Sequence, residues 1–167
     1  KKEGAIFTLS NAPVALRLGT INELATLCQS VVIPADATNT DDLDKLFDQS
    51  IAELGGKIDF ILHSIGMSPN VRKEKPYTIL NYDFYLKSLD ISALSLHKIL
   101  QVAYQKDAIN EYGSVVALSY IAAQRAFPFY GDMAEAKAAL ESIARNFGYH
   151  YGIKNKVRIN TVSQSPT

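Results

Sequence analysis

Hydrophobic positions along the chain form short continuous runs separated by longer stretches with helical spacing. Five runs are almost uninterrupted in their apolar character and predict buried strands: Ala5–Leu9, Val31–Ile33, Ile58–Leu62, Gly113–Ser119 and Val157–Val162. A strand that is apolar at consecutive positions leaves no face for water, which is typical of parallel sheets covered on both sides. The runs therefore predict a parallel sheet.

The stretches between these runs carry apolar residues three and four positions apart, which predicts helices. The expected helices span 20–28, 40–54, 82–106 and 130–151, with Thr20, Thr40 and Asn81 as candidate N-terminal caps. Segment 10–13 is expected to be a turn and segment 67–80 a polar loop. The alternation of strand and helix predicts one Rossmann-like, doubly wound α/β domain over residues 1–167, with helices on both faces of the sheet.

Charge and cysteine content narrow the class of partner. Seventeen basic residues balance seventeen acidic ones, so nothing favours a nucleic acid or an anionic membrane as partner. The single Cys28 excludes an intrachain disulfide and fits a reducing compartment.

At the two ends, Lys1–Gly4 is typical of the end of a helix, and the chain stops just past an apolar strand. We therefore expect a fragment of a longer chain.

Four polar segments follow predicted strands: Asp36, 64–66, Ser119–Tyr120 and 165–167. In an open parallel sheet, ligands bind outside the carboxyl ends of the strands, so these segments are expected on one rim. Gly66 would let the backbone approach a ligand, although an ordinary loop glycine fits the pattern equally well. Asp36 would either accept from an adenine amino group or hydrogen-bond its own loop.

Ser10 and Asn11 follow the first predicted strand, where dinucleotide folds often place an acid that holds the ribose 2′-hydroxyl. No acid stands there, and the next basic residue is Arg17. The pattern slightly favours NADH and leaves NADPH open.

Tyr130 and Lys137 are seven residues apart, a spacing that returns to the same helix face within roughly 20°. A neighbouring ammonium is expected to lower the pKa of the phenol and make it a better proton donor. The alternative is a packed tyrosine with a solvated lysine. Tyr120 is a second phenol able to reach the same cleft, or a rim aromatic. His63, His97 and His150 have no ligand-like spacing, so no metal site is expected.

Together these residues resemble the enoyl-acyl carrier protein reductases of bacterial type II fatty acid synthesis, which are short-chain dehydrogenase/reductases. The resemblance rests on Ser119-Tyr120, Tyr130, Lys137, Ser64–Gly66 and the segment 157–160. Its discriminating part is the six-residue gap between Tyr130 and Lys137, where ordinary members of the superfamily have three. Two parts of the family pattern are missing, namely a glycine-rich phosphate loop with its strand and helix of roughly 30 residues, and the substrate helices after the last strand.

The resemblance implies roles for individual residues. Tyr130, Tyr120 and Lys137 would be catalytic, and Ser68, Tyr120 and Tyr130 would contact substrate. The expected cofactor contacts are Ser10, Asp36, Ala37, Ser64, Ile65, Gly66, Ser119, Lys137 and Thr167.

The implied reaction is NADH-dependent reduction of a trans-2-enoyl thioester on acyl carrier protein, by a cytoplasmic homotetramer whose interfaces are the helices at 82–106 and 130–151. Two alternatives stay open. One is a 3-ketoacyl reductase of the same superfamily, and the other is a non-catalytic nucleotide-sensing module.

Overall fold

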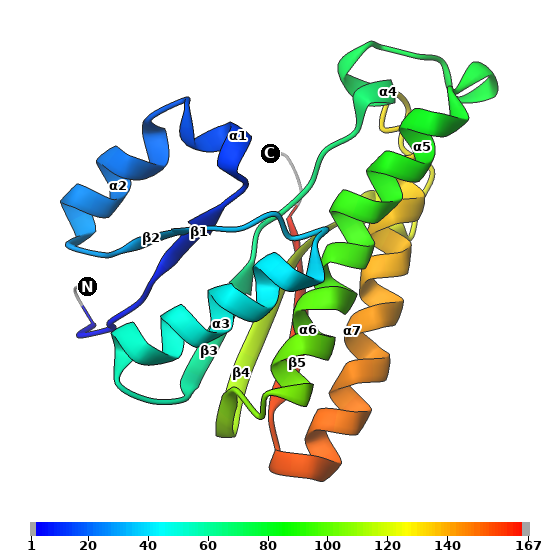
Figure 1. Cartoon of the computed structure of the whole chain (residues 1–167). Helices are drawn as coiled ribbons and strands as arrows, with labels where there is room; N and C mark the ends of the chain where they lie inside the picture. Colours follow the sequence, from blue (N-terminus) through cyan, green and yellow to red (C-terminus); the bar gives the residue numbers. More distant parts are fainter. Residues whose placement is uncertain (1–2, 165–167) are drawn as a thin grey trace.

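Parallel strands form two small sheets in the computed structural model, which describes residues 3–164 (Figure 1). In the first sheet, β1 (Leu9–Asn11) pairs with β2 (Val32–Pro34). In the second, the order is β3-β4-β5, with β3 at Ile58–His63, β4 at Ile109–Tyr120 and β5 at Arg158–Gln164. Every pairing is parallel, so the carboxyl ends of β3, β4 and β5 share one edge.

Helices cover these sheets in the manner of a doubly wound fold. The first half of the chain contains α1 (Pro13–Leu16), α2 (Thr20–Cys28), α3 (Thr40–Leu54) and α4 (Pro69–Arg72). The second half contains α5 (Tyr82–Leu89), α6 (Ser95–Gln105) and α7 (Met133–Asn155). Three short helical turns complete the set: η1 (Tyr77–Ile79), the π-helical η2 (Asp90–Leu94) and η3 (Ile121–Ala123). In Figure 1, α2 and α3 lie on opposite sides of the β1–β2 pair, and α3, α6 and α7 lie side by side. The Rossmann-like prediction is confirmed.

The core lies between the sheet and the row of α3, α6 and α7. Its centre consists of side chains with no exposed surface: Leu43, Leu96, Leu100, Val115 and Leu140. Replacing a buried leucine of this kind by alanine typically costs about 2 to 5 kcal/mol. This layer packs β4 against α7, and these two elements carry Tyr120 and Lys137.

Two predicted elements at the amino-terminal end are wrong in position. The first strand is Leu9–Asn11 rather than Ala5–Leu9, so Ser10 and Asn11 belong to a strand and α1 follows where only a turn was expected. The physical reason is pairing. The partner strand β2 is only three residues long, and it pairs with Leu9–Asn11.

Helix boundaries differ where local hydrogen bonding overrides the hydrophobic pattern. Asn81 caps α5 by accepting from the Phe84 N–H, as predicted. Asn39, not Thr40, caps α3 by accepting from the first-turn N–H groups, and Gly19, not Thr20, precedes α2. The predicted helix at 82–106 is interrupted by the π turn η2, and the loop at 67–80 contains α4 and η1.

The helix expected from Tyr130 begins three residues later, at Met133. Phe129 and Gly131, on either side of Tyr130, have φ values of 68° and 49°. These lie in the left-handed region, which a right-handed helix cannot include. Tyr130 therefore sits in a loop that leads into α7.

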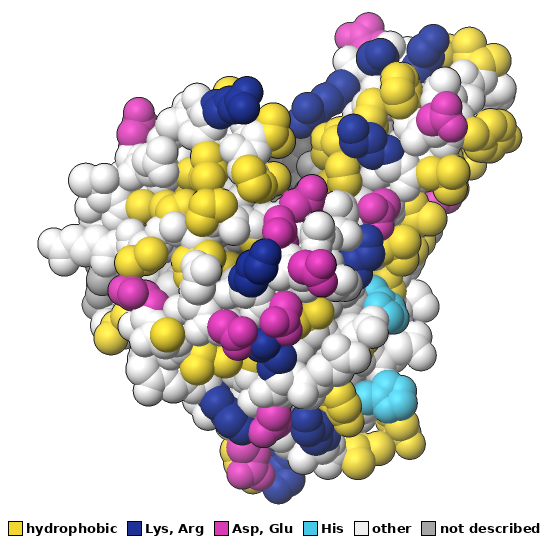
Figure 2. Space-filling model, viewed as in Figure 1, with side chains coloured by type: hydrophobic (Ala, Val, Ile, Leu, Met, Phe, Trp, Pro, Cys, Tyr) yellow, Lys and Arg dark blue, Asp and Glu magenta, His cyan; other side chains and the backbone are white. Residues whose placement is uncertain are grey.

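The described surface is mixed in charge. Figure 2 shows Lys and Arg side chains interspersed with Asp and Glu over the visible face. Among residues 3–164, no helix is long and apolar enough to cross a membrane.

Candidate active site

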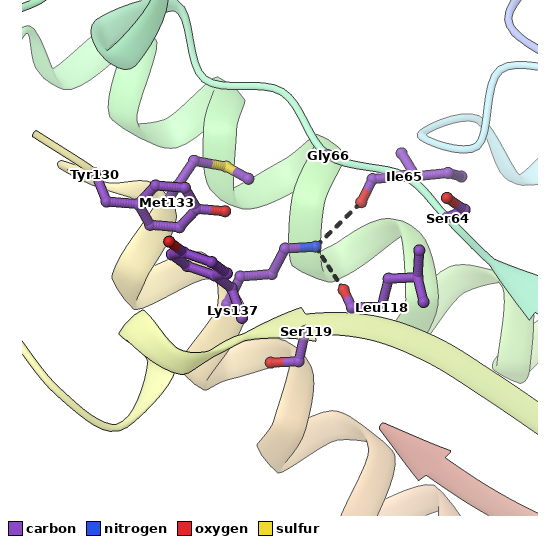
Figure 3. A pocket seen from close by; sticks show the side chains of 9 residues that line it. Ser64, Ile65, Gly66, Leu118, Ser119, Tyr130, Met133 and Lys137 are labelled. Atoms are coloured by element: carbon purple, nitrogen blue, oxygen red, sulfur yellow. Dashed lines mark hydrogen bonds between the residues drawn. The ribbon is translucent and has the colours of Figure 1, made fainter. Parts of the chain in front are cut away.

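A cleft of about 440 Å³ opens at the carboxyl ends of β3 and β4 (Figure 3). Its wall comes from three parts of the chain: the segment after β3, the end of β4, and the loop and first two turns of α7. The lining residues are Ser64, Ile65, Gly66, Leu118, Ser119, Tyr120, Tyr130, Met133 and Lys137. Most of the residues that the sequence singled out for chemistry are thus brought together.

Lys137 occupies the centre of this cleft. Its side chain is 6% exposed, and its Nζ donates to the Leu118 carbonyl oxygen at 2.7 Å and to the Ile65 carbonyl oxygen at 3.4 Å (Figure 3). Burial lowers the pKa of Lys137. An ammonium carries three protons, so one remains for a ligand. The lysine therefore links two strand ends while facing the cleft.

Tyr130 lies beside Tyr120, with ring centroids 4.5 Å apart. Burial, and secondarily Tyr120, raises the pKa of Tyr130. The predicted lowering of this pKa by Lys137 is wrong for this structure. Tyr130 precedes the helix, and the lysine ammonium is turned toward two backbone carbonyls. Because desolvation disfavours the phenolate, Tyr130 is a neutral hydrogen-bond donor at neutral pH.

Gly66 makes room for the lysine. A Cβ at this position would lie 3.2 Å from Met133 Cε and 3.6 Å from Lys137 Nζ. The contact with Met133 Cε is tighter than an ordinary van der Waals contact, whereas the one with Lys137 Nζ is ordinary. The absence of a side chain thus leaves both the lysine and the backbone of this loop open toward the cleft, which is what a bound cofactor requires.

Ser119 and Ser68 make other contacts through their hydroxyl groups. Ser119 is buried, and its Oγ donates to Glu141 Oε1 at 2.7 Å, away from the cleft. Ser68 is also buried and lies outside the cleft lining. Its Oγ accepts from the Val71 N–H at 3.0 Å and donates to Asp132 Oδ1 at 2.6 Å.

The residues expected near the adenine end lie apart from the cleft lining. Ser10 is exposed on β1, and Ala37 packs against the core. Asp36 Oδ1 accepts from the N–H and the hydroxyl of Thr38, and these bonds, the backbone one first, lower the pKa of Asp36. This is the loop-bonding arrangement that the sequence left open for Asp36. Thr167 lies outside the described residues.

Sequence reasoning did not identify Leu118 and Met133 as part of the cleft. Met133 lies four residues before Lys137 on α7, so helical spacing alone would have placed both on one face. The Leu118 carbonyl oxygen accepts a hydrogen bond from Lys137. A backbone contact of this kind leaves no signal in the sequence.

The histidines take no part in the cleft lining. His63 is buried with Nε2 at 2.8 Å from Ser95 Oγ, and its pKa is lowered to about 4 by burial and by the charge of Lys137. His97 and His150 line a groove between α6 and α7. Within the part of the chain that the structure describes, no group of acidic, His and Cys side chains is arranged to hold a metal ion.

Comparison with known proteins gives consistent matches to one family. The sequence model described as enoyl-(acyl carrier protein) reductase matches residues 1–167. The FabI–NADH complex from Alistipes finegoldii superposes with a TM-score of 0.96 at 61% identity, covering 99% of this chain and 58% of that one. Among curated relatives, a chloroplastic NADH enoyl-[acyl-carrier-protein] reductase from Oryza sativa is 37% identical over 71% of this chain. FabI from Rickettsia bellii is 34% identical over 78% of it.

These matches cover only part of each relative. The chain spans 31% of the rice protein and 48% of the Rickettsia protein.

Proposed function

This chain belongs to the enoyl-(acyl carrier protein) reductase family, and from that premise we propose that the full-length protein reduces trans-2-enoyl thioesters on acyl carrier protein with NADH. The observation that carries the proposal is the cleft that Tyr120, Tyr130 and Lys137 line together. The names of the relatives, which are NADH-dependent enoyl reductases, support the same reaction.

The residues present fit a dinucleotide at this cleft. Gly66 leaves its backbone uncovered, and Lys137 has a donor to spare for a ribose hydroxyl. Ser64, Ile65 and Ser119 complete the nicotinamide end, whereas Ser10, Asp36, Ala37 and Thr167 are proposed contacts for the rest of the cofactor. When bound, NADH supplies the hydride that reduces C3 of the enoyl group. We assign NADH rather than NADPH because no basic side chain adjoins Ser10.

Tyr130 is proposed to donate a hydrogen bond to the thioester carbonyl oxygen. Negative charge grows on this oxygen as the enoyl group is reduced, so a neutral phenol binds it more strongly in the transition state than in the ground state. Lys137 adds positive potential, and Tyr120 supplies a second phenol beside the first. Ile65 and Met133 provide apolar wall, which excludes water and strengthens these interactions. Ser68 is proposed to contact substrate through its backbone, because its hydroxyl is already bonded to Asp132 and the Val71 N–H.

Substrate preference separates this proposal from its two rivals. We expect the full-length protein to oxidise NADH faster with crotonyl or longer enoyl thioesters than with the matching 3-ketoacyl thioesters. A preference for the ketoacyl substrate would indicate a carbonyl reductase. NADH binding without substrate-dependent oxidation would indicate a nucleotide sensor.

The assembly and location form part of the same proposal. We infer a homotetramer that buries the groove between α6 and α7. The groove is lined chiefly by apolar side chains and has a volume of about 680 Å³. A cytoplasmic location is supported by the free thiol of Cys28, which a reducing compartment maintains.

A further inference from the structure

Asp132 is a buried acid beside the cleft. Its carboxylate does not line the cleft and does not cap its own helix. It is 1% exposed and stands at the N-cap position of α7, two residues after Tyr130. An aspartate at this position normally accepts from first-turn N–H groups of its own helix. Here the side chain makes no such bond. The carboxylate instead accepts hydrogen bonds from side chains of other elements.

Three buried side chains from two other elements surround this carboxylate. Ser68 Oγ donates to Oδ1 at 2.6 Å, and Asn70 Nδ2 donates to Oδ2 at 2.9 Å. Ser88 Oγ, on α5, lies 2.8 Å from Oδ2. All three partners are at most 4% exposed. Within residues 3–164, no cationic side chain forms an ion pair with Asp132, so neutral donors and the positive end of the α7 dipole stabilise it.

The cluster joins three elements at one point. Ser68 caps α4, and Asn70 exchanges hydrogen bonds with the backbone of Asn81, the cap of α5. The carboxylate of Asp132 thereby ties the start of α7 to α4 and α5 together.

The segment held in this way is the one that presents Tyr130. Phe129 and Gly131 are both left-handed, and Phe129 is almost fully exposed. No side-chain hydrogen bond reaches the phenol of Tyr130 from any described residue. The left-handed backbone at Phe129 is strained and persists only where surrounding contacts impose it. Asp132, two residues after Tyr130, supplies buried polar contacts to this segment.

We propose that Asp132 is a positioning residue, which holds the Tyr130 loop at the cleft through its bonds to Ser68, Asn70 and Ser88. The role in catalysis rests on the proposed function, whereas the effect on the loop does not. Asp132→Asn keeps the shape of the side chain but replaces one acceptor oxygen with a donor that faces other donors. We expect the loop to move and the phenol to lose its alignment.

A double-mutant cycle in the full-length protein tests this role. Asp132→Asn should lower kcat by about 10- to 100-fold, the usual cost of a small misplacement, with little change in KM for NADH. In a Tyr130→Phe background, the same substitution should lower kcat less than about threefold, because coupled residues are not additive. Equal losses in both backgrounds would overturn the proposal. Asp48→Asn, at an exposed residue of α3 paired with Lys106, is the matched control and should change neither constant.

Hydrogen exchange supplies a readout that does not depend on turnover. Asp132→Asn should speed amide exchange in peptides covering residues 127–136 and leave those covering β4 unchanged. Unchanged exchange at 127–136 contradicts the positioning role even if the protein is active. If the unsubstituted protein fails to turn over enoyl thioesters, the proposed function fails, and the exchange result still decides the role of Asp132.

Discussion

At the scale of single residues, Lys137 determines the form of the cleft. Its buried ammonium bonds the carbonyls of Ile65, in the segment after β3, and of Leu118, near the end of β4. The same group is positioned to meet a cofactor ribose. Because the Lys137 ammonium lies at the cleft, small changes beside it should affect ligand binding.

Gly66→Ala is the sharpest such change. The new Cβ would lie 3.2 Å from Met133 Cε and 3.6 Å from Lys137 Nζ. We expect NADH binding to weaken by about 1 kcal/mol, the lower end of the usual cost of overpacking, because the flexible end of Met133 can shift. Fluorescence titration of NADH measures the effect. Gly56→Ala is the control, because a Cβ there meets nothing within 4 Å. Equal binding by both variants would contradict the account of Gly66.

His63 should make stability depend on pH. Its pKa of about 4 in the folded protein lies below the ordinary value of 6.5, so the unfolded chain binds the proton more readily. The stabilisation from keeping His63 neutral is complete above pH 6.5 and is lost as pH falls toward 4, by about 3 kcal/mol in all. Urea unfolding at several pH values should show this loss in the unsubstituted protein and a clearly smaller one in His63→Phe. Parallel curves for the two proteins would exclude this role.

The sequence identified the phenols and the ammonium but not how they are held. Tyr130 and Lys137 line one cleft, as expected, but the prediction from helical spacing was wrong, because Tyr130 lies in the loop before α7. The left-handed backbone on both sides of Tyr130 was not predictable, because Phe129 carries no sign of it. The direction of the Tyr130 pKa shift was predicted wrongly because burial raises this pKa, and the Lys137 ammonium bonds two backbone carbonyls instead.

At the scale of elements, the π turn η2 interrupts the helix predicted at 82–106 and contacts a residue of the cleft. An extra residue in the turn projects Ser92 inward, where its Oγ accepts from the Met67 N–H at 2.9 Å and lies 3.3 Å from Met133 Sδ. The hydrophobic pattern predicted one continuous helix because apolar spacing does not record a single inserted residue. The apolar runs located β3, β4 and β5, but the prediction that all are buried was wrong for β3, where Phe60 and Leu62 are exposed.

Ser92→Ala should destabilise the protein through this contact. It leaves the Met67 N–H without its acceptor, which typically costs about 1 to 3 kcal/mol for a buried group. Chemical denaturation of the variant measures the loss. Thr26→Ala removes an exposed hydroxyl that bonds only its own helix, and should change the free energy of unfolding by less than about 0.5 kcal/mol. A Ser92 variant as stable as the Thr26 variant would show that η2 is not held by this bond.

At the scale of the whole molecule, the described chain is a doubly wound fold in two sheets, covered by helices and open at one rim. Alternating strands and helices made the fold class predictable. The division into a β1–β2 pair and a β3–β4–β5 sheet was not, because strand order is decided by pairing over long distances in the chain. The groove between α6 and α7 is the surface that the proposed tetramer would bury.

Ala139→Glu tests the tetramer. Ala139 lines the groove, and glutamate is a good helix former, so the charge should break the interface while the helix persists. Sedimentation should show a smaller species than that of the unsubstituted protein. Ala138→Glu, at the preceding residue and outside the groove lining, should leave the assembly intact. Identical sedimentation of the two variants would argue against this interface.

The central claim is that Tyr130 and Lys137 act together on an enoyl thioester, and the most direct measurement is NADH oxidation by the full-length protein with such a substrate. We predict turnover by the unsubstituted protein and a fall in kcat of about 100-fold or more in Tyr130→Phe, as expected when a donor to a developing oxyanion is removed. Lys137→Ala should also weaken NADH binding. Turnover undiminished by both substitutions would contradict the assignment.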